Sequence, residues 1–421
     1  MLRLKRNSTL GAVALLGAVF GASATAEDQS EIKTVFVIAM ENHNWTQPDN
    51  QFSGRIQQIF QNSNAPFINS LVNGTSPGFV VDDGRMASIS GQVAYATDYH
   101  NVLATPGGNN PHIHPSEPNY LWSEGGTNFG VLNDNDPFAP TGGTNQNISQ
   151  HLSTLLTRAG KTWRSYQEDI DLARNVAGQL TNSPLPRNQW TVPLSSFSGI
   201  FAPGFVNAFN GSNQFNYAAK HNPMVFFTNT NGGNDTSPAN PLSQHYAPLQ
   251  QLAADLASAK MADYNWITPN QFNDMHTALT GGYKGLTGDA ANIRQGDDFL
   301  SKLVPTIMAS KAYKENGVIV IWWDESESDG VAGDNPDEFD HTIGEIIISP
   351  LAHANVNGLP YASSVNLTHS SDLRTMQEVF RLQPFLGDAA NGNDLSDLFR
   401  PGVISSNPDG EHEGSARANN L

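Results

Sequence analysis

Two pairs of oxygen-bearing side chains follow directly after two strongly apolar segments. Glu41-Asn42 follows residues 34–40 (TVFVIAM), and Asp324-Glu325 follows residues 318–323 (VIVIWW). Continuous apolar runs are typical of central strands in a parallel sheet that is covered on both faces. Because parallel strands end at the same edge of a sheet, three carboxylates and an amide oxygen should meet there. Carboxylates held together repel one another without a cation, so the pattern predicts one divalent metal ion with oxygen ligands, of the Mg²⁺, Ca²⁺ or Mn²⁺ type.

A serine in a helix-starting sequence is the second candidate. Within residues 114–120 (HPSEPNY), Ser116 comes shortly before Pro118, where its hydroxyl can cap the first turn of a helix through Leu121. The N–H groups of such a turn favour a bound anion. Taken alone, the motif fits an ordinary helix cap better than a nucleophile. A phosphoryl group bound there would have a nucleophile, amide donors and, if the sheet edge is near, a cation.

Histidines near the ends of predicted elements form the third candidate set. His276 comes shortly after a predicted strand, His341 just before another, and His369 leads into a helix, while His114 lies in the serine segment. A lone histidine is more often structural than catalytic, but three in such places indicate that some line a site. If they act in the charged form, an ordinary pKa of about 6.5 predicts a mildly acidic pH optimum.

Composition and charge narrow the function classes. The 421 residues carry a net charge of −18 and include no cysteine, which excludes disulfides, thiolate catalysis and cysteine-ligated metals. The acidic excess repels nucleic acids and anionic membrane surfaces, so we expect no nucleic-acid partner. It suits a protein that gathers a cation, although simple solubility explains it equally well.

The first 26 residues have the pattern of a secretory signal. Basic residues open the chain, an apolar run follows at residues 10–22, and Ala24-Thr25-Ala26 supplies small residues for cleavage. The apolar run is shorter than the roughly 20 residues of a spanning helix. We therefore expect an exported protein, periplasmic or extracellular, without a stable membrane anchor.

The remaining pattern predicts how these candidates are positioned. Strands are indicated at residues 34–40 and 318–323 and, more weakly, at residues 224–227, 264–268 and 345–348. Helices are indicated at residues 67–72, 148–159, 249–259, 297–310 and 373–382, and residues 106–147 read as long loops around a short helix. Alternation of strands and helices predicts an α/β fold, a three-layer sandwich with a central, mostly parallel sheet. We expect one catalytic domain over residues 27–400 and a polar tail over residues 401–421.

Several segments, in order, resemble one known family. They are MENHNWTQ, NAPFINSLV, HPSEPNY, TWRSYQED, TPNQFNDMH, VIVIWWDES and NLTHSSDLRTMQEVF, and they extend from about residue 34 to about residue 380. Together they resemble the bacterial and fungal phosphoesterase family, which includes acid phosphatases and phosphatidylcholine-type phospholipases C. The resemblance implies an alkaline-phosphatase-like fold and hydrolysis of a phosphate ester.

Carried over to this sequence, the resemblance implies roles for individual residues. Glu41, Asn42, Asp324 and Glu325 would bind one metal ion, and Ser116 would be the nucleophile that forms a phosphoserine. Asn119 would shape the phosphate pocket, and His276 and His369 would contact phosphate or move protons. We add His114 and His341 as candidates for substrate binding.

One departure from the family pattern bears on the substrate. The phospholipase branch runs from its Asp-Glu through a short Gly-aromatic stretch to an Asp-His pair. Here Ser326-Glu327-Ser328 follows, and Asp340-His341 comes only after a longer acidic loop. This favours an acid-phosphatase-like enzyme, with a phospholipase C as the alternative. A non-catalytic exported module that binds calcium is the rival from another class.

Overall fold

The computed structural model describes residues 31–47, 57–76, 79–80, 86–87, 89–101, 114–258, 260–326, 341–355 and 357–404. The predicted signal sequence and nearly all of the predicted tail lie outside these residues. Within them, no helix combines the length and the apolar character needed to cross a bilayer.

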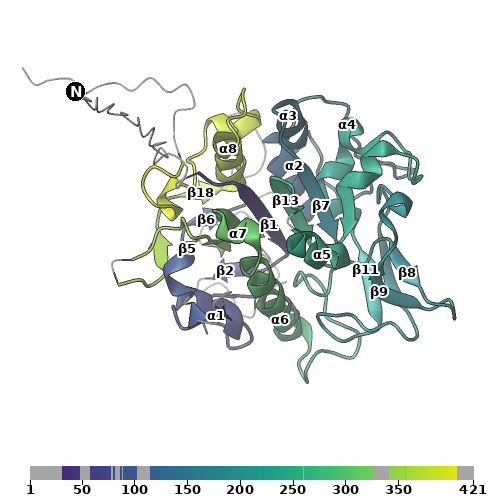
Figure 1. The fold of residues 1–421 in the computed structure, drawn as a ribbon, viewed down its shortest axis with the longest axis horizontal. Helices are drawn as coiled ribbons and strands as arrows, with labels where there is room; N and C mark the ends of the chain where they lie inside the picture. Colours follow the sequence, from purple (N-terminus) through teal and green to yellow (C-terminus); the bar gives the residue numbers. More distant parts are fainter. Residues whose placement is uncertain are drawn as a thin grey trace, which may run out of the picture.

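An eight-stranded sheet forms the centre of the fold (Figure 1). In spatial order its strands are β12 (Tyr246–Pro248), β7 (Trp163–Gln167), β13 (Tyr264–Thr268), β1 (Thr34–Met40), β14 (Gly317–Trp323), β16 (Glu345–Ile348), β5 (Val93–Ala96) and β17 (Tyr361–Ser363). Neighbouring strands are parallel except at β16, which runs antiparallel to both β14 and β5. The sheet is therefore mostly parallel, as the sequence predicted.

Helices cover both faces of this sheet. The helices α2 (Ser116–Gly125), α3 (Leu152–Arg158), α4 (Thr228–Asn231) and α8 (His369–Val379) pack together on one face, and α1 (Pro66–Val72), α5 (Leu252–Ala257), α6 (Gly288–Met308) and α7 (Lys311–Lys314) on the other. The indole of Trp322 reaches the first layer, where its Nε1 donates to His369 Nδ1 at 2.9 Å. On the opposite face α6 comes close to the strands at Gly296, where a Cβ would lie 2.9 Å from Met40 Cε. The predicted three-layer α/β sandwich is confirmed.

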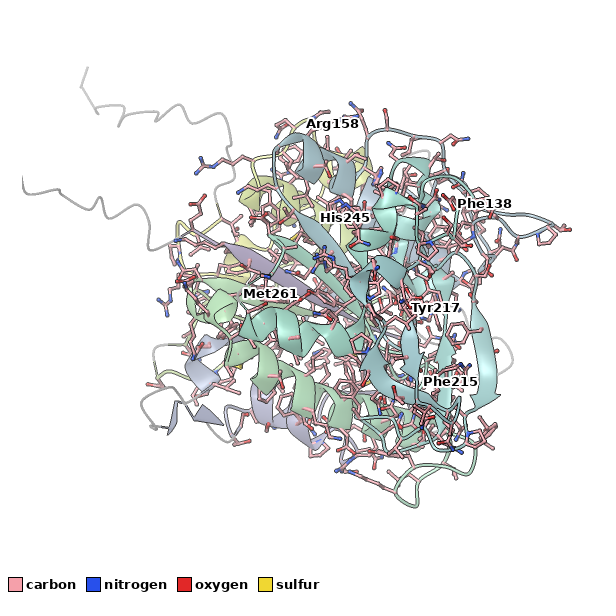
Figure 2. All side chains as sticks on the ribbon, turned by 45° about the vertical axis from the view of Figure 1, so that its right-hand side comes forward. Phe138, Arg158, Phe215, Tyr217, His245 and Met261 are labelled. Atoms are coloured by element: carbon pink, nitrogen blue, oxygen red, sulfur yellow. The ribbon has the colours of Figure 1, made fainter. Side chains whose placement is uncertain are left out.

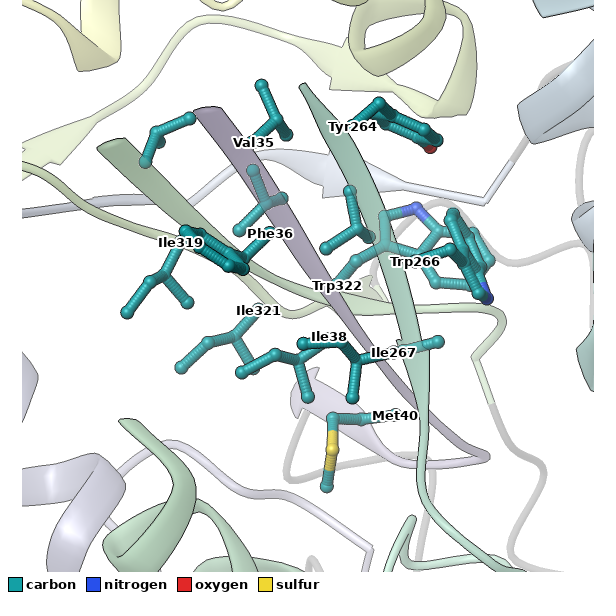
Figure 3. Packing of buried hydrophobic residues seen from close by; sticks show 14 of the residues in the cluster. Val35, Phe36, Ile38, Met40, Tyr264, Trp266, Ile267, Ile319, Ile321 and Trp322 are labelled. Carbon is teal, nitrogen blue, oxygen red and sulfur yellow. The ribbon is translucent and has the colours of Figure 1, made fainter. Parts of the chain in front are cut away.

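The two central strands owe their position to their composition. Every residue of β1 and of β14 is buried, and both consist mainly of β-branched and aromatic side chains. Figure 3 shows these side chains packed along β1, β13 and β14. Such residues fit a pleated surface that is covered on both sides.

In the part of the chain that the structure describes, five smaller two-stranded pairs accompany the sheet. They are β2 (Asn44–Thr46) with β15 (Thr342–Ile343), β3 (Phe79–Val80) with β4 (Met86–Ala87), β6 (Tyr99–His100) with β18 (Leu367–Thr368), β8 (Leu172–Arg174) with β9 (Leu180–Pro184), and β10 (Phe197–Phe201) with β11 (Gln214–Tyr217). In the last pair, the centre of the Phe197 ring lies 5.7 Å from that of Phe215 and 5.9 Å from that of Tyr217. Phe215 and Tyr217, both on β11, are labelled in Figure 2.

Some predicted elements differ from the observed ones. Residues 224–227 were predicted as a strand, but Pro223–Phe226 is a buried 3-10 helix, because a short apolar run does not distinguish a strand from a buried helical turn. Strand β7 was missed, because its polar Ser165 and Gln167 interrupt an apolar strand pattern; they bond each other and the distant Asn222 and Thr268. Helix α6 begins at Gly288 rather than at residue 297. The other predicted strands and helices are confirmed, with displaced helix ends.

Helix α1 takes its N-terminal cap from another helix. Asp297 on α6 accepts hydrogen bonds from Phe67 N at 3.1 Å and Ile68 N at 2.9 Å, while the N-cap position, Ala65, has no side-chain acceptor. Burial nevertheless raises the pKa of Asp297 to about 6. The stability tied to this carboxyl is thus fully present below its unfolded pKa of 3.8 and is lost as the pH rises through about 6.

We expect Asp297→Asn to make the free energy of unfolding depend less on pH in this range. Between about pH 4 and pH 7 the wild type should lose about 2 kcal/mol more free energy of unfolding than the variant, measured by urea denaturation. Glu315→Gln is the control, because Glu315 forms an exposed pair with Lys311. Parallel stability curves for Asp297→Asn and the wild type would contradict the assignment.

Candidate active site

The ends of β1 and β14 bring the first candidate residues together. Met40 and Trp323 are register partners, so Glu41 and Asp324 leave the sheet side by side. Asp324 N donates to Met40 O at 3.2 Å, and Asn42 N donates to Asp324 Oδ1 at 3.1 Å. Asn42 adopts the left-handed conformation (φ 47°), which asparagine tolerates better than most residues. The predicted meeting of the carboxylates at one edge of the sheet is confirmed.

Ser116 points at these carboxylates. Its Oγ donates to Glu41 Oε2 at 3.1 Å and to Glu325 Oε1 at 3.3 Å. The prediction that Ser116 caps its helix is wrong: Pro115 is the N-cap residue, Ser116 is the first helical residue, and a more distant carboxylate, Asp134, accepts from Glu117 N in the first turn. The hydroxyl is therefore available for another purpose, which is the arrangement expected of a nucleophile.

Helix α2, which carries the serine, is buried along its whole length. It ends at Gly126, whose positive φ of 67° and close approach to Leu386 O exclude a side chain. Tyr120, one turn after Ser116, donates to Glu41 Oε1 at 2.5 Å. The same helix thus positions the hydroxyl and one of the carboxylates.

The carboxylates occupy an unfavourable environment for charge. Burial, followed by repulsion from Asp324 and Asp274, raises the pKa of Glu41 well above its usual value. Burial and then Glu325 raise the pKa of Asp324 in the same way. Asp274, which we had not selected from the NDMH segment, is fully buried, and its pKa is also raised by burial and by Asp324.

The arrangement of oxygen atoms fits a cation. The Asn42 amide oxygen lies 3.0 Å from Glu41 Oε2 and 3.2 Å from Glu325 Oε1, so acceptor faces acceptor. Turning the amide over would convert these contacts into hydrogen bonds, but Asp324 Oδ2 would still have no donor among the described residues. A cation among these oxygens gives all of them a partner. The donor set of carboxylates and an amide suits a hard divalent ion.

A histidine that the sequence analysis left unassigned completes the cluster. His221 is buried, with Nε2 3.2 Å from Glu41 Oε1 and Nδ1 3.4 Å from Asp274 Oδ2, and it stacks on Tyr120. Glu41, His221 and His276 present ligand atoms within 4.8 Å of one another, so these three side chains could also hold a metal ion. A single histidine between Lys220 and Asn222 carries no distinctive sequence signal, which is why it was missed.

His276 lies where the sequence placed it, but its charge state differs from our expectation. Its ring centre is 5.7 Å from that of His221, and its Nδ1 is 2.9 Å from Thr277 Oγ1. Burial and the nearby Lys220 lower the pKa of His276 to about 4. His276 therefore does not have the ordinary pKa that we assumed for it, and the mildly acidic optimum stays a prediction.

The loop that carries Asp274 and His276 is held by a buried glutamate. Glu168, directly after β7, accepts from Asn270 N at 2.9 Å and from Asn273 Nδ2 at 2.9 Å. Asp274 in turn accepts from His276 N at 2.8 Å, and its carbonyl accepts from Glu41 N at 2.8 Å. The loop is thus fixed against both β7 and β1.

His369 has a different position from the one expected of a phosphate contact. It is fully buried, its Nδ1 accepts from Trp322 Nε1, and its Nε2 donates to Asp324 O at 2.5 Å. Burial lowers its pKa to about 3. Both ring nitrogens are therefore used within the protein, and the contact to Asp324 O positions that residue.

Two of the remaining candidates, His114 and Asn119, contact Glu325. His114 Nδ1 is 2.9 Å from Glu325 Oε2, and Asn119 Nδ2 donates to the same oxygen at 3.3 Å. His341 is buried directly before β15, which pairs with β2 just beyond the turn at Asn42. The structure thus brings Ser116, Glu41, Asn42, Asp324, Glu325, Asn119 and His114 together.

Comparison with known proteins agrees with this site. The model of the phosphoesterase family matches residues 10–383. The chain belongs to the phosphoesterase family. This assignment accounts for the order of motifs that hold the serine and the carboxylates.

The individual relatives share only a modest part of their sequence with this chain. A probable acid phosphatase of Kluyveromyces lactis is 29% identical over 52% of this chain and 39% of its own length. An acid phosphatase of Aspergillus fumigatus is 31% identical over 41% and 30%. A phosphatidylinositol-3-phosphatase of Mycobacterium tuberculosis is 23% identical over 81% and 78%. The match therefore spans well under half of the two acid phosphatases.

Solved structures give a weaker likeness. One is a protein in the alkaline phosphatase superfamily from Vibrio parahaemolyticus, with 10% sequence identity and a TM-score of 0.44. The alignment covers 88% of this chain and 72% of that protein's chain.

Replacing one carboxylate should raise the melting temperature of the metal-free protein but weaken the further rise that a bound metal ion causes. Asp324→Asn removes a buried like charge, so we expect the melting temperature of the metal-free phosphoesterase to rise. Added Mg²⁺, Ca²⁺ or Mn²⁺ should raise the melting temperature of the wild type and do so far less in the variant, with metal affinity weakened at least about tenfold.

Glu345→Gln is the matched control, since Glu345 is a buried carboxyl that repels Asp372 outside this cluster. It should keep the wild-type response to metal. An undiminished metal response in Asp324→Asn would remove Asp324 from the ligand set.

Proposed function

We propose that this chain is a metal-dependent phosphoric ester hydrolase that cleaves phosphomonoesters through a phosphoserine on Ser116. The observation that carries the proposal is the pair of hydrogen bonds from Ser116 Oγ to Glu41 and Glu325 at the start of a buried helix. The family and the acid phosphatase relatives support this reading.

Glu41, Asn42, Asp324 and Glu325 would hold one divalent ion. When bound, the ion would supply positive charge that offsets phosphate charge and lowers the pKa of a nearby hydroxyl. In the first step, Ser116 Oγ attacks phosphorus and its proton passes to a carboxylate oxygen of Glu41 or Glu325, which already accept it. The phosphorus–oxygen bond to the alcohol breaks in line.

The alcohol needs a proton as it leaves, and we assign that proton to His276. A bound phosphate dianion favours the charged ring and raises its pKa above the value of about 4 in the protein alone. Water then attacks phosphorus and gives a proton to the neutral His276, while the bond between phosphorus and Ser116 Oγ breaks. Ser116 Oγ takes back the proton held by the carboxylate, and inorganic phosphate is released. Asn119, His114 and His341 are proposed to contact the substrate, and His369 to position Asp324.

Phospholipid diesters are the alternative substrates, through phospholipase C chemistry at the same serine. The acid-phosphatase names of two relatives favour monoesters. Export, predicted from residues 1–26, is part of the proposal as well. A non-catalytic calcium-binding module is the third reading, and it requires no reactive serine.

Ester hydrolysis by the wild type and by Ser116→Ala distinguishes these readings. We expect the wild type, with a divalent ion, to cleave p-nitrophenyl phosphate faster than its bis-ester, and Ser116→Ala to lose at least about a thousandfold in kcat. Cleavage of the bis-ester alone would favour the phospholipase reading. If the wild type cleaves neither ester with any of the three ions, the proposed hydrolase activity is wrong.

The role of His276 is tested by the choice of leaving group. His276→Asn should lower kcat for phenyl phosphate about a hundredfold, because the phenolate that leaves needs a proton. The same variant should lose less than about tenfold on p-nitrophenyl phosphate, whose leaving group is less basic. Equal losses on the two substrates would show that His276 is not the proton donor.

A further inference from the structure

The first turn of α2 offers a phosphoryl group few backbone donors. Glu117 N donates to Asp134 Oδ1 at 3.1 Å, and Pro118 has no N–H. A helix start normally binds an anion through such N–H groups. A phosphate beside Ser116 must therefore draw more of its positive partners from side chains or from a metal ion.

The charge at the site does not suit a dianion without a further cation. Glu41, Asp324 and Glu325 bring three carboxylates, and one divalent ion offsets only two of them. Asp274 lies against the same cluster. A phosphomonoester carries two negative charges and a diester one, so an additional positive charge matters more for the monoester.

Lys220 supplies a cation at this position. Its Nζ bonds Asp134 Oδ2 at 2.8 Å, so it shares one carboxylate with the N–H that directly follows Ser116. Its electrostatic interactions extend to Glu41, Glu325 and Asp274. The next residue, His221, contacts Glu41, so the short helix of residues 219–221 runs along the site.

We propose that Lys220 is a substrate-binding residue that contacts the phosphoryl oxygens and selects dianionic monoesters over monoanionic diesters. This inference rests on the proposed function. It explains why the enzyme would prefer phosphomonoesters to diesters. Asp134 is a positioning residue, because one of its oxygens holds the Lys220 ammonium and the other holds the first turn of α2. One carboxylate thereby ties the lysine to the backbone of Glu117, the residue that directly follows Ser116.

Lys220→Met tests the proposal by binding and by catalysis. Calorimetric titration at about pH 8 should show at least a tenfold loss of affinity for inorganic phosphate and little change for dimethyl phosphate. On p-nitrophenyl phosphate kcat/KM should fall about a hundredfold, and on the bis-ester less than about tenfold. Lys220→Arg should retain most of the preference, since it retains the charge.

Lys284→Met is the matched control, because Lys284 also pairs with an aspartate, Asp298, but outside this site. It should bind phosphate and cleave both esters as the wild type does. Asp134→Asn should shift the monoester-to-diester ratio in the same direction as Lys220→Met, by a smaller factor.

Unchanged phosphate affinity in Lys220→Met, or equal losses on the two esters, overturns the proposal. If Lys220→Met does not fold, Lys220→Gln is measured in its place against the same limits. The phosphate titration needs no turnover, so it tests Lys220 separately from the hydrolase activity, whose own failure appears as an inactive wild type.

Discussion

The repulsion among carboxylates at one edge of the sheet is the constraint on which the site depends. The register between β1 and β14 places Glu41 beside Asp324, and hydrogen bonds of the sheet prevent their backbones from separating. Burial raises the pKa values of both, and of Asp274, because charge is poorly solvated there. The fold thus keeps an electrostatically costly arrangement that a cation relieves.

The layer of helices on one face of the sheet holds the other partners of this cluster. Helix α2 is wholly buried and brings both Ser116 and Tyr120 to Glu41. His369 on α8 bonds the backbone of Asp324 and the indole of Trp322. These contacts join two helices to the two central strands, so the nucleophile and the carboxylates are fixed by the same packing.

The sequence led us to expect positive charge at the site from histidines, but the structure points to a lysine. Burial lowers the pKa values of His276 and His369, so these rings are neutral in the protein without substrate. Positive charge comes instead from Lys220, which an aspartate holds beside the start of α2. In our proposal this lysine, together with a divalent ion, sets the preference for a dianionic phosphomonoester.

The sequence by itself determined the two central strands, the acids that follow them and the serine at a helix start, because long apolar runs and helix-start residues act locally. It did not determine β7, whose polar side chains bond Asn222 and Thr268 from distant segments, nor the 3-10 helix at Pro223–Phe226. Only the tertiary structure brought His221 to Glu41 and Lys220 to Asp134, and buried His369 behind Asp324. These outcomes depend on burial and on contacts between distant segments, which residue type and spacing do not encode.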